Sequence, residues 1–365
     1  MLWKLTDSYL EGTYNNDDND NINNNINNNK IASFDLDSTL IKTKSGKVFS
    51  RNENDWMFYN LNVREKLSEL INNNYSIVVF SNQRGLNSEI KLSIWKKKVT
   101  NFCEALDLPI KIFAAIKNDK YRKPRINMYT EHYDITEHSF YVGDAAGRPN
   151  DFSDSDYKFA LNLKIPFYTP ESFFKNIDDS NTYTITSHFE KQKPAENKYN
   201  KFKKHERELI IMVGCPGSGK SYYTTNYIIP NHYERINRDT LKTMKKCEKK
   251  CKELMINNKN IVIDNTNPSI DSRLPFILLA KEYNYYIRVI EFTTPTELSI
   301  HNMWFRHYKD GTPVLSKIVY NIYKKKYEQP TSSEGIDKIE QLDFQIEFEK
   351  HPTSNITDMY NTYYH

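Results

Sequence analysis

The sequence predicts a two-domain α/β protein in which each domain is built on a mainly parallel sheet. Two observations indicate this fold. Short apolar runs alternate with helical patterns in two separate regions, and a polar stretch at 176–208 lies between these regions. A length of 365 residues is consistent with two to three ordinary domains.

The first region contains four apolar runs that are expected as buried parallel strands. We expect these strands at Ile31–Leu36, Ser76–Phe80, Ile110–Ala114 and Ser139–Val142, and the clearest helices at Val63–Asn72 and Ser88–Leu106. The second region repeats the scheme, with strands at Leu209–Val213, Asn260–Asp264 and Tyr285–Phe292 and helices at Ser221–Tyr227, Thr240–Ile256 and Asp271–Tyr283. Sites in such sheets gather beyond the carboxyl ends of the strands.

These patterns divide the chain into four segments. We expect a short N-terminal segment at 1–30, a first α/β domain at 31–175, a linker at 176–208 and a second α/β domain at 209–365. Residues 14–30 are nearly all Asn and Asp, so they cannot bury apolar surface to offset the entropy of ordering. We therefore predict that this tract is disordered.

Composition excludes several classes of protein. Hydrophobic residues make up 38% of the chain and charged residues 27%, which allows buried cores but is too polar for a membrane protein. The N-terminus lacks the basic and apolar regions of a signal peptide. Four scattered cysteines are too few for a disulfide framework or a zinc site. We therefore expect an intracellular protein that is not secreted and has no membrane partner.

The net charge of +4 is only mildly basic, so contacts to a polyanion have to come from local patches. Four runs of lysine are candidate contacts to a nucleic-acid backbone, with a solvated surface as the alternative for each. They are Lys96–Lys98, Lys201–Lys204, Lys245–Lys250 and Lys324–Lys326.

Polar residues follow each expected strand of the first region. Asp35 and Asp37 lie two apart after the first strand and therefore share a face. One carboxylate can attack phosphorus to form an acyl phosphate, while the other transfers a proton to and from the leaving oxygen. An Asp after a strand also often caps the next helix, so this pair alone is a weak signal.

The other strand ends strengthen the phosphatase interpretation. Ser81 offers a hydroxyl for phosphate oxygens, and Lys123 offers a cation for a phosphoryl group in transfer. Asp144 follows the fourth strand, where it can hold a hard divalent ion together with Asp35. The occurrence of all these groups in order, each at a strand end, favours a phosphatase site.

These motifs resemble those of the haloacid-dehalogenase-type phosphotransferases, and in particular the phosphatase half of the polynucleotide kinase 3′-phosphatase family. The segments DLDST, SNQ, RKP and GDAAGR carry the likeness, which extends through most of residues 31–174. The resemblance implies a haloacid-dehalogenase-like doubly wound parallel sheet with an open site suited to a polymer end. The implied roles are nucleophile for Asp35, general acid and base for Asp37, contacts to the phosphoryl group for Ser81 and Lys123, and magnesium binding by Asp35, Asp37 and Asp144.

Two features depart from the family pattern. Ser38 stands where the family usually has Gly before Thr39. The stretch between Arg148 and Asp151 is shorter than the basic loop of the animal enzymes, and this would weaken contact with DNA.

The second region carries a phosphate-binding motif. Residues 214–221, GCPGSGKS, fit G-x-x-x-x-G-K-[ST] and lie between an apolar run and a helical pattern, as the motif requires. Backbone N–H groups of such a loop surround phosphate oxygens, the lysine reaches the β- and γ-phosphates, and the hydroxyl helps to hold Mg²⁺. The expected contacts to ATP and Mg²⁺ are Gly214, Gly217, Ser218, Gly219, Lys220 and Ser221.

A phosphate-binding loop predicts nucleotide binding but not a reaction. Asp239 is either the N-cap of the following helix or a general base for an attacking hydroxyl. Asp264 ends a strand at a position that can organise Mg²⁺ or substrate. Residues 301–310, HNMWFRHYKD, are a candidate lid that brings a cation to the transferred phosphate, with a solvated basic helix as the alternative.

The segments NRDT, IDNTNP and HNMWFR resemble the 5′-hydroxyl polynucleotide kinase module of the same family, up to about Pro330. The resemblance implies that Asp239 is the catalytic base and Arg306 the lid arginine. It also implies that Arg238, Asp264 and Arg273 line the pocket for the nucleotide end. Trp304 stands where many relatives have an earlier arginine, so an indole there could stack on a base.

The pairing of the two modules predicts an enzyme that restores ligatable ends. Ligation requires a 3′-hydroxyl and a 5′-phosphate, and damage often leaves the reverse. We expect a bifunctional polynucleotide 3′-phosphatase and ATP-dependent 5′-hydroxyl kinase that acts on DNA strand breaks. Its phosphatase-first order resembles the animal DNA-repair enzymes, so we expect it in the nucleus or at a site of DNA replication or repair rather than in the cytoplasm.

The expected partners follow from the same resemblance. The segment before the phosphatase leaves no room for the forkhead-associated domain of the animal relatives, so recruitment through that domain is not expected. A monomer is the default expectation. Three alternatives stay open: the same activities on RNA ends, a small-molecule phosphatase fused to a nucleoside or sugar kinase, and an inactive protein that binds ends.

Overall fold

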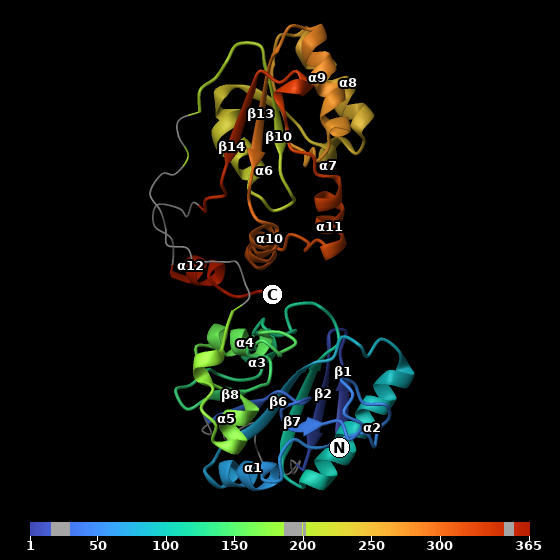
Figure 1. The fold of residues 1–365 in the computed structure, drawn as a ribbon, viewed down its shortest axis with the longest axis vertical. Coiled ribbons are helices and arrows are strands. Elements are labelled where there is room, and N and C mark those ends of the chain that lie inside the picture. Colours follow the sequence, from blue (N-terminus) through green and yellow to red (C-terminus); the bar gives the residue numbers. More distant parts are fainter. Residues whose placement is uncertain (16–29, 186–198, 200–201, 347–353) are drawn as a thin grey trace. The chain divides into compact units, whose positions relative to one another are not determined.

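The computed structural model describes residues 1–15, 30–185, 199, 202–346 and 354–365. The chain divides into two compact units, one formed by Met1–Ser187 with Tyr363–His365 and the other by His188–Thr362. Both units are α/β structures built on mainly parallel sheets (Figure 1), so the predicted fold class is confirmed.

The first unit is built on a seven-stranded sheet in the order β1-β2-β7-β6-β3-β8-β9. Its strands are β1 (Leu2–Leu5), β2 (Tyr9–Tyr14), β3 (Ile31–Phe34), β6 (Ser76–Asn82), β7 (Ile110–Ala115), β8 (Phe140–Val142) and β9 (Phe167–Tyr168). Strands β7, β6, β3, β8 and β9 run parallel, whereas β1 and β2 form an antiparallel edge. A separate hairpin pairs β4 (Ile41–Lys42) with β5 (Met57–Phe58).

Helices cover both faces of this sheet, and apolar side chains fill each interface. One face packs against α1 (Val63–Asn72), α2 (Glu89–Leu106) and α5 (Pro170–Lys175). The other face packs against α3 (Asn127–Thr130) and α4 (Ser155–Leu163). The sheet is therefore buried on both sides, which explains why its parallel strands are near-continuous apolar runs.

The N-terminal boundary differs from the prediction. Strand β2 pairs with β7 at six positions, from Tyr9 opposite Ala115 to Tyr14 opposite Ile110, and its Leu10 lies in the core. The first unit thus includes residues 1–14, which the sequence analysis placed in a separate segment. These strands escaped prediction because they are short and precede the Asn-rich tract, whose residues 16–29 lie outside the described part of the chain.

Two further boundaries differ. The predicted linker began at 176, but Thr184 N–H donates to Ala146 O at 3.1 Å, and η1 (Ser180–Thr182) also belongs to the first unit. At the other end, Tyr363–His365 belong to the first unit rather than to the second. Tyr363 N–H, for example, donates to Asn162 Oδ1 at 2.8 Å. Both corrections rest on long-range hydrogen bonds that no local sequence pattern reveals.

The second unit is built on a five-stranded parallel sheet in the order β11-β12-β10-β13-β14. Its strands are β10 (Glu208–Val213), β11 (Tyr233–Ile236), β12 (Asn260–Ile263), β13 (Tyr286–Phe292) and β14 (Lys338–Leu342). The sequence analysis anticipated β10, β12 and β13 but neither edge strand.

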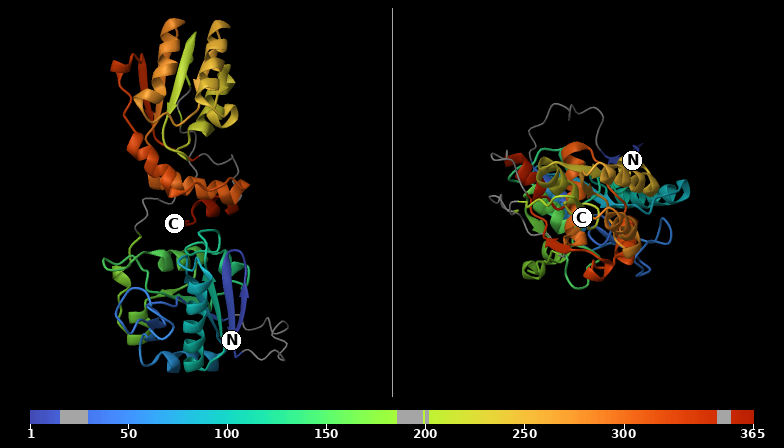
Figure 2. Two further views of the ribbon diagram at one scale, coloured as in Figure 1. Left: turned by 90° about the vertical axis from the view of Figure 1, so that its right-hand side faces the viewer. Right: turned by 90° about the horizontal axis from the view of Figure 1, so that it is seen from above.

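Helices also lie on both faces of the second sheet. Helices α8 (Met244–Ile256) and α9 (Ile270–Glu282) pack side by side on one face (Figure 2), and α6 (Lys220–Tyr223) with the π-helix η2 (Thr224–Ile228) lies on the other. The remaining elements are η3 (Ile229–Asn231), α7 (Arg238–Leu241), α10 (Thr296–Asp310), α11 (Lys317–Lys326), η4 (Ser332–Glu334) and α12 (Ser354–Tyr360).

The helix expected at Thr240–Ile256 is two helices. Lys242 has a φ of 72°, which ends α7, and the Thr243 side chain caps α8 by accepting from Lys246 N–H. Helix α7 is therefore a single turn that ends before the long helix α8 begins.

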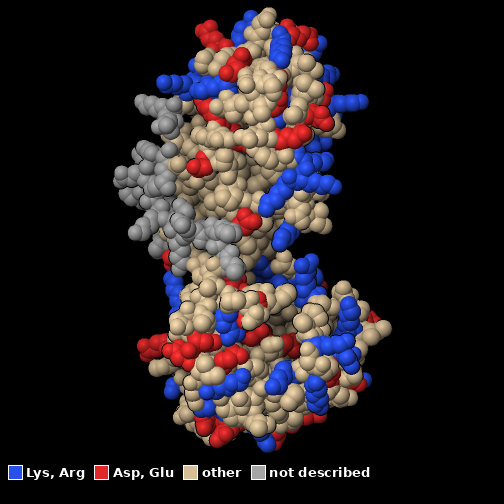
Figure 3. Space-filling model, viewed as in Figure 1, with Lys and Arg blue, Asp and Glu red and all other residues tan. Residues whose placement is uncertain are grey.

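Within the described residues, no helix combines the length and the apolar character needed to span a bilayer. Lys and Arg side chains lie among Asp and Glu over the face shown in Figure 3, in keeping with the small net charge.

Candidate active sites

The predicted phosphatase residues meet at the carboxyl ends of the first sheet. Asp35 directly follows β3, Ser81 lies at the end of β6, and Asp144 comes shortly after β8. The loop after β7 brings in Lys123. The backbone of Asp35 continues the sheet, since its N–H donates to Val142 O at 2.8 Å.

Lys123 is the centre of a buried polar network. Its Nζ donates to Asp35 Oδ1 at 2.7 Å, to Asp156 Oδ1 at 2.7 Å and to the Tyr141 hydroxyl at 2.6 Å. Asn82 holds the Lys123 backbone: its Oδ1 accepts from Lys123 N–H at 3.0 Å, and its Nδ2 donates to Lys123 O at 3.1 Å. Burial by itself lowers the pKa of Lys123. The carboxylates of Asp156 and Asp35 together have the larger, opposite effect, so the pKa of Lys123 is raised.

Asp156 was not anticipated from the sequence. It lies in the first turn of α4, and both of its oxygens are used, because Oδ2 accepts from Ala145 N–H at 3.1 Å. A Cβ at Gly143 would lie 2.5 Å from Asp156 Cγ, so only glycine allows this approach. The glycine that precedes Asp144 is the one sequence signal that could have pointed to Asp156.

Three carboxylates form a group that could hold a metal ion. Asp35, Asp144 and Asp156 each offer an oxygen, and these oxygens lie within 4.8 Å of one another. Burial raises the pKa of Asp35 to about 7, with Lys123 opposing and Asp156 adding to the rise. Burial, and then Asp35 and Asp156, also raise the pKa of Asp144. The single Lys123 ammonium does not balance three carboxylates, and their oxygen donors fit a hard divalent cation.

Asp37 lies beside this group but its carboxylate is engaged elsewhere. Gln83 Nε2 donates to its Oδ2 at 2.7 Å and Lys98 Nζ to its Oδ1 at 2.8 Å. Gln83 Nε2 also donates to Ser81 Oγ at 3.0 Å. The structure therefore gives the Asp37 side chain no place in the carboxylate group that was predicted to include it, and it adds Lys98 to the site.

The phosphate-binding loop of the second unit connects β10 to α6. Lys220 Nζ donates to Gly214 O at 2.8 Å, to Cys215 O at 2.7 Å and to Ser218 Oγ at 3.1 Å. It forms no ion pair with a described carboxylate. Burial lowers the pKa of Lys220 to about 8, against the weaker effects of Cys215 and Asp264.

Helix α10 packs directly on this loop. Asn302 Nδ2 donates to Gly217 O at 2.9 Å, and the Thr294 hydroxyl, just before α10, donates to Ser218 O at 2.8 Å. Gly217 has a φ of 82°, and a Cβ there would collide with Ser299 O. Two of the loop's carbonyl oxygens are thus already bound to the protein.

Asp264 lies next to Ser221. The Ser221 hydroxyl donates to Asp264 Oδ1 at 3.2 Å, and Arg235 Nε donates to Oδ2 at 2.8 Å. The sequence analysis gave Asp264 two possible roles, organising Mg²⁺ or lining the pocket for the nucleotide end. Its carboxylate lies beside the Ser221 hydroxyl that is expected to hold Mg²⁺, which favours the first role. Arg235 was not anticipated because it comes from the unpredicted strand β11.

The residues of the NRDT segment differ in their hydrogen bonds and in their exposure. Asn237 Oδ1 accepts from Asp239 N–H at 2.8 Å and from Thr240 N–H at 3.3 Å, so Asn237 and not Asp239 is the N-cap of α7. Arg238 and Asp239 are exposed. No described residue donates to the carboxylate of Asp239, which is therefore available to a ligand.

The Arg273 side chain is bound to other residues of the second unit. It is fully buried in α9, and its Nε and Nη2 donate to the two Glu334 oxygens at 2.8 and 2.7 Å. Its Nη1 donates to Asn267 O at 3.2 Å and to Glu328 O at 3.0 Å. The structure thus does not present Arg273 to a nucleotide end, because its donors are used within the unit.

The candidate lid is helix α10. Its first half is bound to the phosphate-binding loop, whereas Arg306 in its second half is exposed. Trp304 is buried, with its ring 5.7 Å from that of His307, so the suggested stacking on a base does not fit this structure.

Comparisons with known proteins agree with this description. Residues 30–174 match the family model described as "Polynucleotide kinase 3 phosphatase", and residues 209–330 match an "AAA domain". The "Bifunctional polynucleotide phosphatase/kinase" of Schizosaccharomyces pombe is 37% identical over 94% of this chain and 85% of its own length. A protein of Acanthamoeba polyphaga mimivirus is 37% identical over 94% of this chain and 90% of its own. The "Polynucleotide 3'-phosphatase" of Saccharomyces cerevisiae is 32% identical over 40% of this chain and 87% of its own.

The folds and sites define a haloacid-dehalogenase-type phosphatase joined to a P-loop kinase. This class is the one expected from the sequence. The chain belongs to the bifunctional polynucleotide phosphatase/kinase family, and the predicted family and enzyme class are confirmed.

Proposed function

We propose that this enzyme heals DNA strand breaks by removing 3′-phosphates and by phosphorylating 5′-hydroxyls with ATP. The observation that carries the proposal is the presence of two opposite phosphoryl-transfer sites in one chain whose relatives carry the names of both activities. Both activities on one terminus would cancel, whereas on opposite sides of a break they create the pair of ends that ligation requires.

In the phosphatase reaction, Asp35 Oδ attacks phosphorus, the bond from phosphorus to the 3′-oxygen breaks, and Asp37 delivers a proton to that oxygen. Water then attacks the acyl phosphate, Asp37 accepts its proton, and Asp35 is released. Lys123, already 2.7 Å from Asp35, offsets charge on the phosphoryl group, and Ser81 contacts its oxygens.

In the kinase reaction, the 5′-hydroxyl oxygen attacks the γ-phosphorus of ATP while Asp239 accepts the hydroxyl proton. The bond from the γ-phosphorus to the β,γ-bridging oxygen breaks, and ADP leaves. The N–H groups of Gly214, Gly217, Ser218 and Gly219 surround the phosphates, and Lys220 exchanges the loop carbonyls for phosphate oxygens. Arg306 stabilises the transferred group from α10, and Arg238 contacts the nucleotide end.

Both sites fit Mg²⁺ as cofactor. Asp35 and Asp144 would hold it in the phosphatase, since Asp156 already binds Lys123 and a backbone N–H. Ser221 and Asp264 would hold it in the kinase. When bound, the ion would offset the negative charge of the phosphate oxygens.

A polyanionic substrate is supported by Arg122, which precedes Lys123. Its Nη1 is buried, and no described residue accepts a hydrogen bond from it. Burial, and then the nearby Arg84, lower the pKa of Arg122, and neither guanidinium forms an ion pair with a described carboxylate. A phosphate of the strand that carries the 3′ end would supply both the acceptor and the charge.

The setting follows from this activity. We propose that the enzyme acts as a monomer inside the cell, where DNA is replicated or repaired, and that it needs no forkhead-associated domain for this.

The test uses a gapped duplex with a 3′-phosphate and a 5′-hydroxyl, Mg²⁺ and γ-labelled ATP. Asp35→Asn should lose only 3′ hydrolysis and Lys220→Ala only 5′ labelling, each by about 100-fold or more. A matched RNA duplex and free nucleotides are run in parallel. If the RNA duplex or the free nucleotides are turned over faster than the DNA duplex, that molecule and not a DNA end is the preferred substrate.

A further inference from the structure

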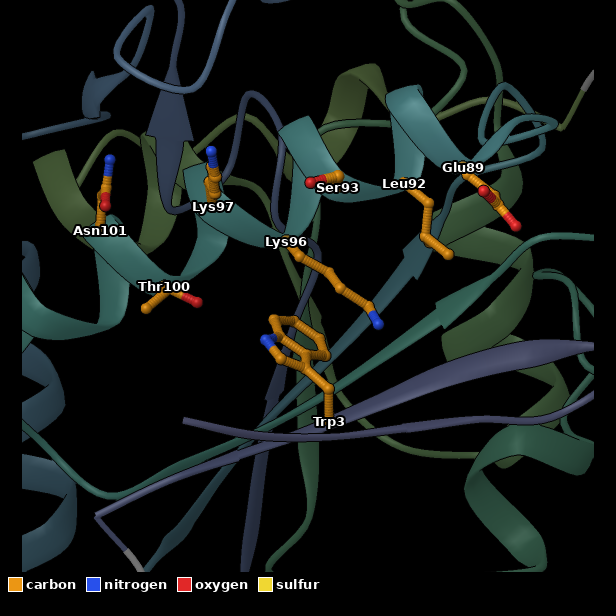
Figure 4. Close-up of a pocket in the computed structure, with 8 residues that line it drawn as sticks. All are labelled: Trp3, Glu89, Leu92, Ser93, Lys96, Lys97, Thr100 and Asn101. Carbon is orange, nitrogen blue, oxygen red and sulfur yellow. The ribbon is translucent and has the colours of Figure 1, made fainter.

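Lys98 is a buried lysine in the middle of α2. Only 5% of its surface is exposed, and it lies beside the core residues Trp95 and Val99. Its sequence neighbours differ, since Lys96 lies over the Trp3 ring at 5.8 Å and Lys97 is exposed (Figure 4). A lysine is almost never buried without a partner, because leaving water is costly for an ammonium. Lys98 is therefore not available to a nucleic-acid backbone.

The partner of Lys98 is Asp37. Lys98 Nζ donates to Asp37 Oδ1 at 2.8 Å and to Ser50 Oγ at 3.4 Å. The other Asp37 oxygen accepts from Gln83 at 2.7 Å. Both oxygens are thus held from the protein side, while 42% of the Asp37 side chain stays exposed. This arrangement restricts the carboxylate without closing it off from a substrate.

We propose that Lys98 is a positioning residue for the phosphatase: its buried ammonium holds the Asp37 carboxylate in the orientation from which it gives its proton to the leaving oxygen. A proton donor must be within hydrogen-bond reach of the atom it protonates, and small misplacements are costly. The contact can persist through the transfer, because Oδ1 remains an acceptor when Oδ2 carries the proton. This inference rests on the proposed function of the first site.

The proton that Asp37 gives matters only for a poor leaving group. In hydrolysis of an alkyl ester such as a 3′-phosphate, the bond from phosphorus to the alkyl oxygen breaks as that oxygen takes the proton. In p-nitrophenyl phosphate the leaving phenolate departs without one. Attack by Asp35 is common to both substrates, and kcat/KM reports the chemistry up to that first bond cleavage. The ratio of the two kcat/KM values therefore isolates the orientation of Asp37.

The experiment compares Lys98→Met, Lys98→Arg and Lys91→Met in the full chain. Lys91 is the matched control, since it is an exposed lysine on the same helix that donates to Asn87 Oδ1 at 3.0 Å. For Lys98→Met we expect kcat/KM on a 3′-phosphorylated oligonucleotide to fall about 10- to 100-fold and that on p-nitrophenyl phosphate to fall less than about 3-fold. Lys98→Arg should restore part of the loss, and Lys91→Met should resemble wild type on both substrates.

A double variant tests the same point. If Lys98 acts through Asp37, adding Lys98→Met to Asp37→Asn should cause no further loss on the oligonucleotide. Three outcomes would each overturn the proposal: equal losses on both substrates, an unchanged oligonucleotide rate, or additive losses in the double variant. Equal losses on both substrates would show that Lys98 acts in folding alone.

Failure of the proposed function is a separate outcome. If wild type hydrolyses p-nitrophenyl phosphate but no 3′-phosphorylated oligonucleotide, the substrate assignment is wrong. A nucleoside 3′-monophosphate then takes the place of the oligonucleotide, because its alkyl leaving group also needs a proton. The ratio of its kcat/KM to that of p-nitrophenyl phosphate, compared between wild type and Lys98→Met, decides the role of Lys98.

Discussion

The two active sites differ in how the charge of their central lysine is compensated. In the phosphatase, Lys123 touches two carboxylates at 2.7 Å, and its pKa is raised. In the kinase, Lys220 touches two carbonyl oxygens and a hydroxyl, and burial lowers its pKa to about 8. Both lysines are buried, so the difference lies in their partners and not in their exposure.

This contrast suggests two ways of preparing a cation for a phosphate. The phosphatase lysine belongs to an ion network that exists without substrate, so it contributes to folding as well as to chemistry. The kinase lysine is held by neutral groups that phosphate oxygens can replace, so its positive charge is compensated only when the nucleotide binds. The first site is therefore pre-assembled, and the second is completed by its ligand.

The largest expected effect compares Lys123→Met with Lys220→Met. Lys123→Met should destabilise the first unit by about 3–5 kcal/mol, because it leaves Asp35 and Asp156 buried without a cation. Lys220→Met should leave the second unit within about 1 kcal/mol of wild type, because it removes a buried charge that has no ion partner. Each variant should lose only its own activity.

Hydrogen exchange followed by mass spectrometry measures both units in the full chain. Peptides from β6 and β8 report on the first unit, and peptides from β10 and β13 report on the second. A loss of protection in the second unit of Lys220→Met, equal to that in the first unit of Lys123→Met, would contradict the comparison.

A smaller effect separates a structural arginine from an exposed one. Arg273→Met should destabilise the second unit by about 3 kcal/mol, since it breaks a buried bidentate pair with Glu334. Arg238→Met should change the unfolding free energy by less than about 0.5 kcal/mol, because its side chain is exposed. Instead it should raise KM for a 5′-hydroxyl oligonucleotide. Denaturant unfolding and kinase assays at low temperature distinguish the structural role of Arg273 from the substrate-binding role of Arg238. If Arg273→Met had the stability of wild type but a raised KM, Arg273 would be a substrate contact after all.

The smallest effect concerns the turn beside Asp35, the proposed nucleophile of the phosphatase. Ser38 is exposed and has a φ of 65°, a left-handed conformation that costs a residue with a Cβ about 1–2 kcal/mol. Ser38→Gly, the usual family residue, should therefore raise the unfolding free energy of the first unit by about 1 kcal/mol. Thr43→Gly, just after the neighbouring strand β4, serves as a control that should not stabilise, because Thr43 does not have a positive φ. A lower denaturation midpoint for Ser38→Gly would show that the serine side chain stabilises the turn.

Structural features that depend only on residues close together in the chain could be predicted from the sequence. The parallel strands are continuous apolar runs because both faces of each sheet are buried, so β3, β6, β10 and β13 could be located. The phosphate-binding loop was also readable, because its glycines and Lys220 have to stand at set spacings around one phosphate group. The same holds for Asp35 and Asp37, which a strand end places two residues apart.

Only the tertiary structure decided which distant groups meet. Asp156 at the start of α4 accepts from Lys123 of the loop after β7, Lys98 in the middle of α2 donates to Asp37, and Glu334 accepts from Arg273. These pairs were not readable from the sequence, because an ion pair depends on distance in space, and a buried lysine in a run of lysines has the same local pattern as an exposed one. The sequence by itself determined the class of fold and the family and predicted the reacting groups, whereas packing determined which buried charges are compensated.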